Sequence, residues 1–144
     1  MSPIKVDDIQ TEGWDTIHKA AYCGNYKILL EELNTGISVN HLSNNFKSKQ
    51  KLFRYKQLGY EYIDITFSNM YPLYLASQRG HHKCVKLLME RGADPNILVK
   101  NERFNVTYNA FDIAWICDNY ITYNLMKKIN KNKSKTSPKE YDQP

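Results

Sequence analysis

Several features that would assign a function directly are scarce or missing in this sequence. The 144 residues contain three cysteines, Cys23, Cys84 and Cys117, without CxxC spacing, which argues against a disulfide framework or a zinc knuckle. No apolar run approaches the roughly 18 residues of a membrane span, and the N-terminus lacks an apolar signal-peptide core. We therefore expect no transmembrane segment and an intracellular setting, by default the cytoplasm.

Sequence signatures of catalysis are absent as well. There is no Gly-rich phosphate loop, no Gly-x-Ser-x-Gly and no His-Glu-x-x-His. His81, His82 and Cys84 could suggest a metal, but no further ligand follows at a suitable spacing. We expect Cys84 to be buried in the packing instead. The expectation is a protein that is not an enzyme, with no catalytic residue, no cofactor, no small-molecule substrate and no metal site.

The excess of positive over negative charge lies in two segments of the chain. The formal net charge is +5, yet residues 127–144 hold six lysines against two acidic residues, and residues 44–59 hold five basic residues and no acid. The remaining residues must therefore be acidic in sum. A basic segment and a basic tail do not make the whole chain a nucleic-acid binder.

Residues 68–96 carry a helix–turn–helix pattern. Pro72 is suited to the first turn of a helix, where its missing N–H is unpaired anyway. Gly80 ends that helix, because glycine readily takes positive φ. A second helix is expected from about His82 to Arg91, and Gly92 stops it.

This stretch resembles the ankyrin repeat, whose pattern runs Thr-Pro-Leu-His-x-Ala-Ala, Gly-His, Leu-Leu, Gly-Ala-Asp-x-Asn. Tyr71 and Tyr74 stand where Thr and His are usual. Twelve positions match in register: Pro72, Leu73, Ala76, Gly80, His81, Val85, Leu87, Leu88, Gly92, Ala93, Asp94 and Asn96. The resemblance implies a mainly α fold, an ankyrin-repeat solenoid of helix–turn–helix repeats joined by β-hairpin finger loops.

Two weaker copies flank this repeat. The upstream copy, residues 12–40, keeps the glycine interval, because Gly24 and Gly36 are as far apart as Gly80 and Gly92. The downstream copy, residues 106–130, has lost its glycine, and Asp118-Asn119 stands in place of Gly-His. In this copy Trp115 replaces a small Ala. We count Trp115 as a core residue. Three repeats are about the minimum for a stable solenoid, since each buries its apolar face against a neighbour.

These boundaries define the expected domain organisation. The ankyrin domain spans residues 12–130, with repeats at about 12–40, 68–96 and 106–130. Residues 1–11 form an N-terminal tail or cap, and residues 131–144 a basic disordered tail.

An insert, residues 41–67, separates the first two copies. Its second half, Gly59 to Phe67, alternates and predicts a strand, so an enlarged finger is the simplest structure. The insert is a tolerated surface expansion, a partner contact, or a grip on RNA or an anionic membrane through basic and aromatic residues. The possible basic contacts are Lys47, Lys49, Lys51, Arg54 and Lys56.

The resemblance also implies where a partner would bind, because ankyrin partners usually contact finger tips and the inward helices. The finger-tip positions are Trp14, Met70 and Tyr108, and the inward-helix positions are Tyr22, Gln78 and Arg79. Trp, Tyr and Arg are the usual anchors of an interface. The alternative is that Trp14 and Tyr108 cover the ends of a short solenoid.

The expected function is a protein–protein interaction module, a scaffold or adaptor whose partner the sequence does not name. Two rivals remain. One is nucleic-acid or anionic-lipid binding through the basic insert and tail. The other is a purely architectural segment of a larger protein, since one repeat fold serves many uses.

Overall fold

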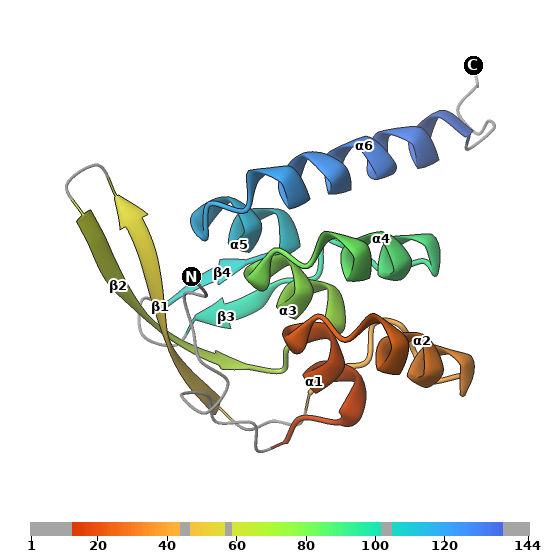
Figure 1. Ribbon diagram of the computed structural model, residues 1–144, viewed down its shortest axis with the longest axis horizontal. Coiled ribbons are helices and arrows are strands. Elements are labelled where there is room, and N and C mark those ends of the chain that lie inside the picture. The colour runs from red at the N-terminus through yellow and green to blue at the C-terminus, as the bar shows by residue number, and fades with distance from the viewer. Residues whose placement is uncertain (1–12, 44–46, 57–58, 102–104, 137–144) are drawn as a thin grey trace.

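Three helix pairs, stacked side by side, form the body of the chain (Figure 1). The computed structural model describes residues 13–43, 47–56, 59–101 and 105–136. The helices are α1 (Thr16–Cys23), α2 (Tyr26–Asn34), α3 (Pro72–Arg79), α4 (His82–Glu90), α5 (Ala110–Ile116) and α6 (Tyr120–Thr136). One row of helices packs α1 against α3 and α3 against α5, and the second row packs α2 against α4 and α4 against α6. The prediction of a mainly helical chain is confirmed.

The turn inside each pair has the same geometry. Gly24, Gly80 and Asp118 hold the left-handed conformation, with φ of 75°, 73° and 62°. In each pair the next residue donates its N–H to the carbonyl five residues before it. The three bonds are Asn25–Ala20 at 2.9 Å, His81–Ala76 at 3.0 Å and Asn119–Ala114 at 2.8 Å. Asp118 replaces the lost glycine because Asp tolerates positive φ better than most residues.

Polar side chains connect neighbouring pairs at these turns. His81 Nε2 lies 2.9 Å from the carbonyl oxygen of Tyr22 in the first pair. Asn119 Nδ2 donates to the carbonyls of Ser77 and Gln78 at 3.0 and 2.8 Å. Each turn thus satisfies carbonyls at the C-terminal end of the preceding inner helix, which have no partner inside that helix.

A four-stranded antiparallel sheet in the order β1-β2-β3-β4 extends beside the helices. Strands β1 (Lys47–Lys56) and β2 (Gly59–Ser68) form a long hairpin, and β3 (Val99–Asn101) and β4 (Val106–Tyr108) a short one. The pairing of Phe67 with Asn101 joins the two hairpins. The strand predicted over Gly59–Phe67 is confirmed and continues to Ser68.

The C-terminal helix is longer than the sequence suggested. A disordered tail was predicted from residue 131, but α6 continues to Thr136, so that boundary is wrong. The physical reason is that residues 131–136 contain neither Gly nor Pro and include lysines, which have good helix propensity. The remainder of the predicted tail, residues 137–144, and the predicted N-terminal segment, residues 1–11, lie outside the described residues.

The apolar core runs through all three pairs. Tyr71 and Tyr74, which replace the usual Thr and His, are both buried, and the Tyr71 hydroxyl donates to the Ile97 carbonyl at 2.7 Å. Cys84 is buried as predicted, while Cys23 is exposed and Cys117 half-buried. Trp115 was predicted to be core, which is wrong, because 53% of its surface is exposed.

Candidate functional site

Most of the residues predicted to contact a partner are buried in the core. Trp14 is only 7% exposed and packs edge-to-face on Tyr22, with ring centroids 5.4 Å apart. Met70 and Gln78 are also buried. The predicted row of Trp14, Met70 and Tyr108 is therefore not an exposed anchor row, because its first two members fill the core. Tyr108 is half-buried beside α5.

Arg79 is held by the first helix pair. Its guanidinium carbon lies 4.8 Å from the centroid of the Tyr22 ring, a cation–π contact between neighbouring inner helices. Burial raises the pKa of the Tyr22 phenol to about 12, against the lowering effect of the Arg79 charge. The structure thus brings Tyr22 and Arg79 together as a link between pairs, and Arg79 remains half-buried.

The five basic residues of the insert all lie on β1. Backbone register sets Lys51 opposite Asp64 and Arg54 opposite Glu61 on β2. Opposite charges at directly facing positions stabilise an antiparallel pair modestly. The other three, Lys47, Lys49 and Lys56, stand opposite Ser68, Thr66 and Gly59. A contact role for these lysines stays a prediction.

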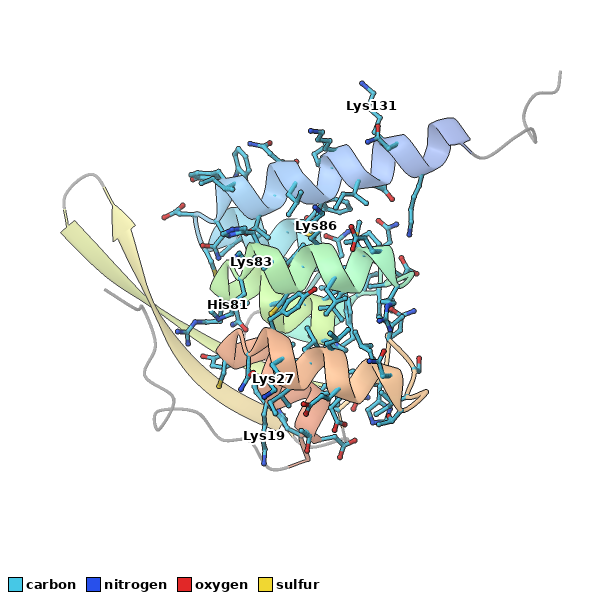
Figure 2. All side chains as sticks on the ribbon, turned by 45° about the vertical axis from the view of Figure 1, so that its right-hand side comes forward. Lys19, Lys27, His81, Lys83, Lys86 and Lys131 are labelled. Atoms are coloured by element: carbon cyan, nitrogen blue, oxygen red, sulfur yellow. The ribbon has the colours of Figure 1, made fainter. Side chains whose placement is uncertain are left out.

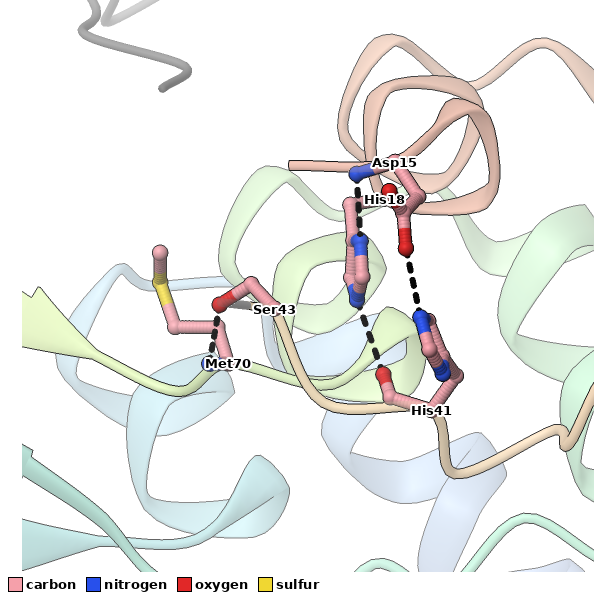
Figure 3. A network of polar contacts seen from close by, with 5 residues as sticks. All are labelled: Asp15, His18, His41, Ser43 and Met70. Carbon is pink, nitrogen blue, oxygen red and sulfur yellow. Dashed lines mark hydrogen bonds and ion pairs between the residues drawn. The ribbon is translucent and has the colours of Figure 1, made fainter. Parts of the chain in front are cut away.

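A polar network ties the start of α1 to the base of the long hairpin (Figure 3). The Asp15 N–H donates to His18 Nδ1 at 2.9 Å, so His18 Nε2 carries the hydrogen and donates to the His41 carbonyl at 2.8 Å. His41 Nε2 in turn lies 2.5 Å from Asp15 Oδ2. Two further residues along, the Ser43 hydroxyl accepts the Met70 N–H at 2.7 Å. The network is structural, because it joins residues of this chain and His18 is fully buried.

This network predicts a loss of stability in mild acid. Burial lowers the pKa of His18 below its usual 6.5, and burial does the same for His81. Both histidines are therefore neutral in the folded state over a range where the unfolded chain binds protons. Above about pH 6.5 these two histidines do not reduce the free energy of unfolding. Below that pH the free energy of unfolding falls, and His18 accounts for at most about 1.4 kcal/mol of the loss per pH unit. Urea unfolding between pH 8 and pH 5 measures this slope.

Two variants identify the histidine responsible. His18→Gln should reduce the slope between pH 6.5 and pH 5, whereas His82→Gln, on the exposed side of α4, should leave it unchanged. An unchanged slope in His18→Gln would show that His18 is not the titrating group.

The described residues hold no group suited to metal binding and no membrane span. No three His, Cys, Asp or Glu in the part of the chain that the structure covers are placed to hold one ion. None of the described helices is both long enough and apolar enough to cross a bilayer.

Exposed and half-buried aromatic side chains cluster on the outward side of the last pair. Trp115 packs edge-to-face on Tyr120 and Tyr123, with centroids 4.8 and 5.1 Å away, and Phe111 packs on Tyr123 at 6.1 Å. Lys127 Nζ lies 5.4 Å from the centroid of Tyr123. Phe111 and Tyr123 are shared by two adjoining hollows, one open along α6 and the other beside β4.

We call this surface the end face and define it by Phe111, Trp115, Tyr123, Lys127 and Lys131. Figure 2 shows Lys131 extending from the side of α6 that is turned away from α4. Sequence reasoning missed the surface, although the signal was present: Trp115 stands where the first two repeats have a small residue. The Trp115 side chain was predicted to fill space in the core, but it projects outward.

Comparison with known proteins agrees with the geometry. A family model described as Ankyrin repeat matches residues 68–100, which include α3 and α4. The human Ankyrin repeat and SOCS box protein 3 is 33% identical over 97 residues, 67% of this chain and 15% of that protein. The bovine protein of the same name is 29% identical over 97 residues, which again are 67% of this chain and 15% of that protein. The chain thus spans about 15% of these relatives.

Ankyrin repeats are generally protein-interaction modules without enzymatic activity. The matched pattern coincides with the middle helix pair, and the similarity to the two relatives extends over two thirds of the chain. The chain is an ankyrin-repeat protein.

Proposed function

We propose that the chain is a non-enzymatic protein-interaction module built from three stacked ankyrin repeats, at about residues 12–40, 68–96 and 106–130. The observation that carries this proposal is the identical turn in all three helix pairs. Gly24, Gly80 and Asp118 share positive φ, and the same backbone hydrogen bond follows each. Equal turns at equal positions support three copies of one unit, including the two copies whose sequences diverge.

The long hairpin is, in this proposal, an enlarged finger of the first junction. It connects the first helix pair to the second, as the short hairpin of β3 and β4 connects the second to the third. Both hairpins belong to one sheet. A finger of ten paired positions offers far more recognition surface than one of three, which favours a partner contact over simple tolerated expansion.

The partner class is another protein, encountered inside the cell. Interaction is the general role of the family, and stacked repeats form extended surfaces for it. The two relatives are named for an ankyrin repeat and a SOCS box, and the aligned part is only 15% of each. Their names therefore suggest the interaction role and no particular partner.

The test is a two-step binding experiment on the full chain. Proteins crosslinked to the purified chain in a nuclease-treated lysate are identified, and each candidate is then purified and titrated against the chain. A variant with residues 44–68 replaced by a short turn is the matched control for the finger. Circular dichroism of that variant verifies that the helices are retained.

We expect at least one purified protein to bind saturably, with weaker binding to the finger variant. Absence of any saturable protein ligand would contradict the proposal and favour an architectural segment. Binding to RNA or to anionic vesicles that falls steeply with salt, with no protein ligand, would favour the electrostatic alternative, because phosphate contacts release counterions.

A further inference from the structure

The end face lies on the side of the last helix pair that corresponds to the packing surface of the first two pairs, where each contacts the pair that follows it. The pairs are compared by counting from their left-handed turn residues, Gly24, Gly80 and Asp118. In the two outer helices with a following neighbour, the fifth and ninth residues after the turn are buried: Leu29 and Leu33 in α2, Val85 and Met89 in α4. The same two positions in α6 hold Tyr123, which is half-buried against Phe111 and Trp115 of its own pair, and Lys127, which is exposed, and no described helix pair follows.

Trp115 prevents a fourth repeat from stacking there in the same register. The equivalent inner-helix positions hold Ala21 and Ser77, both fully buried. Ser77 Oγ lies 3.4 Å from Met126 Sδ of the following pair, so the residue at this position directly contacts the following pair. A tryptophan that is 53% exposed at this place would occupy the volume that Met126 fills in the preceding junction. The occupant of the end face is therefore something other than another repeat packed in the same way.

The charged residues around the end face indicate which kind of ligand would bind there. The hollow along α6 has Phe111 and Tyr123 as its apolar lining and Lys127, Lys128 and Lys131 as its charged lining. The three lysines are exposed. Asp112 lines the second hollow, where its carboxylate accepts the Asn109 N–H at the start of α5. An apolar floor bordered by lysines favours an acidic ligand that also carries a large apolar side chain.

We propose that the end face of α5 and α6 binds an acidic segment of a partner protein, which places an aromatic or aliphatic side chain against Phe111, Trp115 and Tyr123. This inference rests on the proposed interaction function and adds the place and the chemistry of one contact. The apolar anchor supplies burial, and the lysines orient the acidic residues on either side of it.

The two tryptophans give a direct readout of binding at this place. Trp115 belongs to the end face and Trp14 is buried in the first pair, so their two indole N–H signals in an NMR spectrum report on opposite ends of the molecule. The probes are three short synthetic peptides. One has glutamates around a single central Phe, the second replaces that Phe by Gly, and the third replaces the glutamates by lysines.

We expect the first peptide to shift the Trp115 indole signal saturably and to leave the Trp14 signal in place. The charge reversal Lys127→Glu should weaken the binding of this peptide about tenfold or more, as truncating a central anchor does. Trp115→Ala should do the same, and its binding is titrated by calorimetry because the indole signal is lost. Lys86→Glu on α4 and Tyr26→Ala on α2, an exposed lysine and an exposed aromatic outside the end face, are the matched controls. Both should bind within about twofold of the unchanged chain.

Three results would overturn the inference. One is equal binding of the Gly peptide or the lysine peptide. Another is loss of binding in the Lys86→Glu control. The third is a Trp115 signal that moves with protein concentration alone, which would assign the face to a second copy of the chain. If instead a purified partner binds the Trp115→Ala and Lys127→Glu variants as well as it binds the unchanged chain, the interaction function stands and only this surface is wrong.

Discussion

Leu88→Ala is expected to lower the free energy of unfolding by about 3 kcal/mol, within the range measured for buried leucines. Leu88 is fully buried in α4, the outer helix of the middle pair. Because α4 packs against both α2 and α6, a cavity there weakens the part of the stack that both outer pairs depend on. Urea unfolding monitored by helical circular dichroism measures the loss.

The matched control is Leu98→Ala, the same truncation at a side chain that is 59% exposed. We expect a change within about 0.5 kcal/mol, as is usual for surface substitutions. Similar losses in the two variants would contradict a close-packed core at α4. A smaller urea dependence in Leu88→Ala would indicate that the outer pairs unfold separately, since that slope follows the surface exposed on unfolding.

Gly80→Ala is expected to be equally damaging, lowering the free energy of unfolding by about 3 kcal/mol. The backbone of Gly80 has φ of 73°, which strains any residue with a Cβ. A Cβ at this position would also lie 2.7 Å from the side-chain oxygen of Asn119. Asn119 would have to move, and its bonds to the Ser77 and Gln78 carbonyls would be lost.

Two further variants separate backbone strain from the close approach of Asn119. Gly92 has φ of 91° and open space around its Cβ position, so Gly92→Ala should cost only the strain, about 1–2 kcal/mol. Asn119→Ala removes the side chain that a new Cβ would meet. The double variant Gly80→Ala with Asn119→Ala should therefore lose less than the sum of the two single losses. Additive losses would show that Asn119 does not limit the space at Gly80.

The turns of neighbouring helix pairs lie very close together, which gives their glycines a second role besides adopting positive φ. Gly24 faces the His81 ring as Gly80 faces Asn119, with a Cβ position only 2.5 Å from His81 Nδ1. In each junction a glycine of one turn makes room for the side chain that clamps the next pair. Asp118 ends this series, because no described pair follows it.

Local structure was largely readable from the sequence. Pro72, Gly80 and Gly92 punctuate α3 and α4 where turn chemistry predicts, and alternation from Gly59 to Phe67 predicted β2. Cys84 is buried, as expected for a repeat position that an apolar residue usually holds. These features depend on residues near in sequence, so their signal does not require knowledge of the packing partner.

The exposure of single side chains was not readable in this way. Trp14 and Met70 occupy positions that face a partner in a regular finger, yet in this chain they are buried. Trp115 was assigned to the core from its size, and it projects from the end face. The α6 boundary was also misjudged, because a lysine-rich segment was interpreted as disordered although lysine propagates a helix.

Glycine, proline and periodic apolar residues act locally on the backbone, so the family, the turn positions and the helical character could be read without the structure. Which large side chains are available to a partner could be known only from the packing of the helix pairs. Burial depends on what lies across from a side chain, and for Trp14 that is Tyr22, eight positions away in the same repeat. Trp115 packs on Tyr120 and Tyr123 of its own helix pair, and no described pair follows, so it remains exposed on the end face.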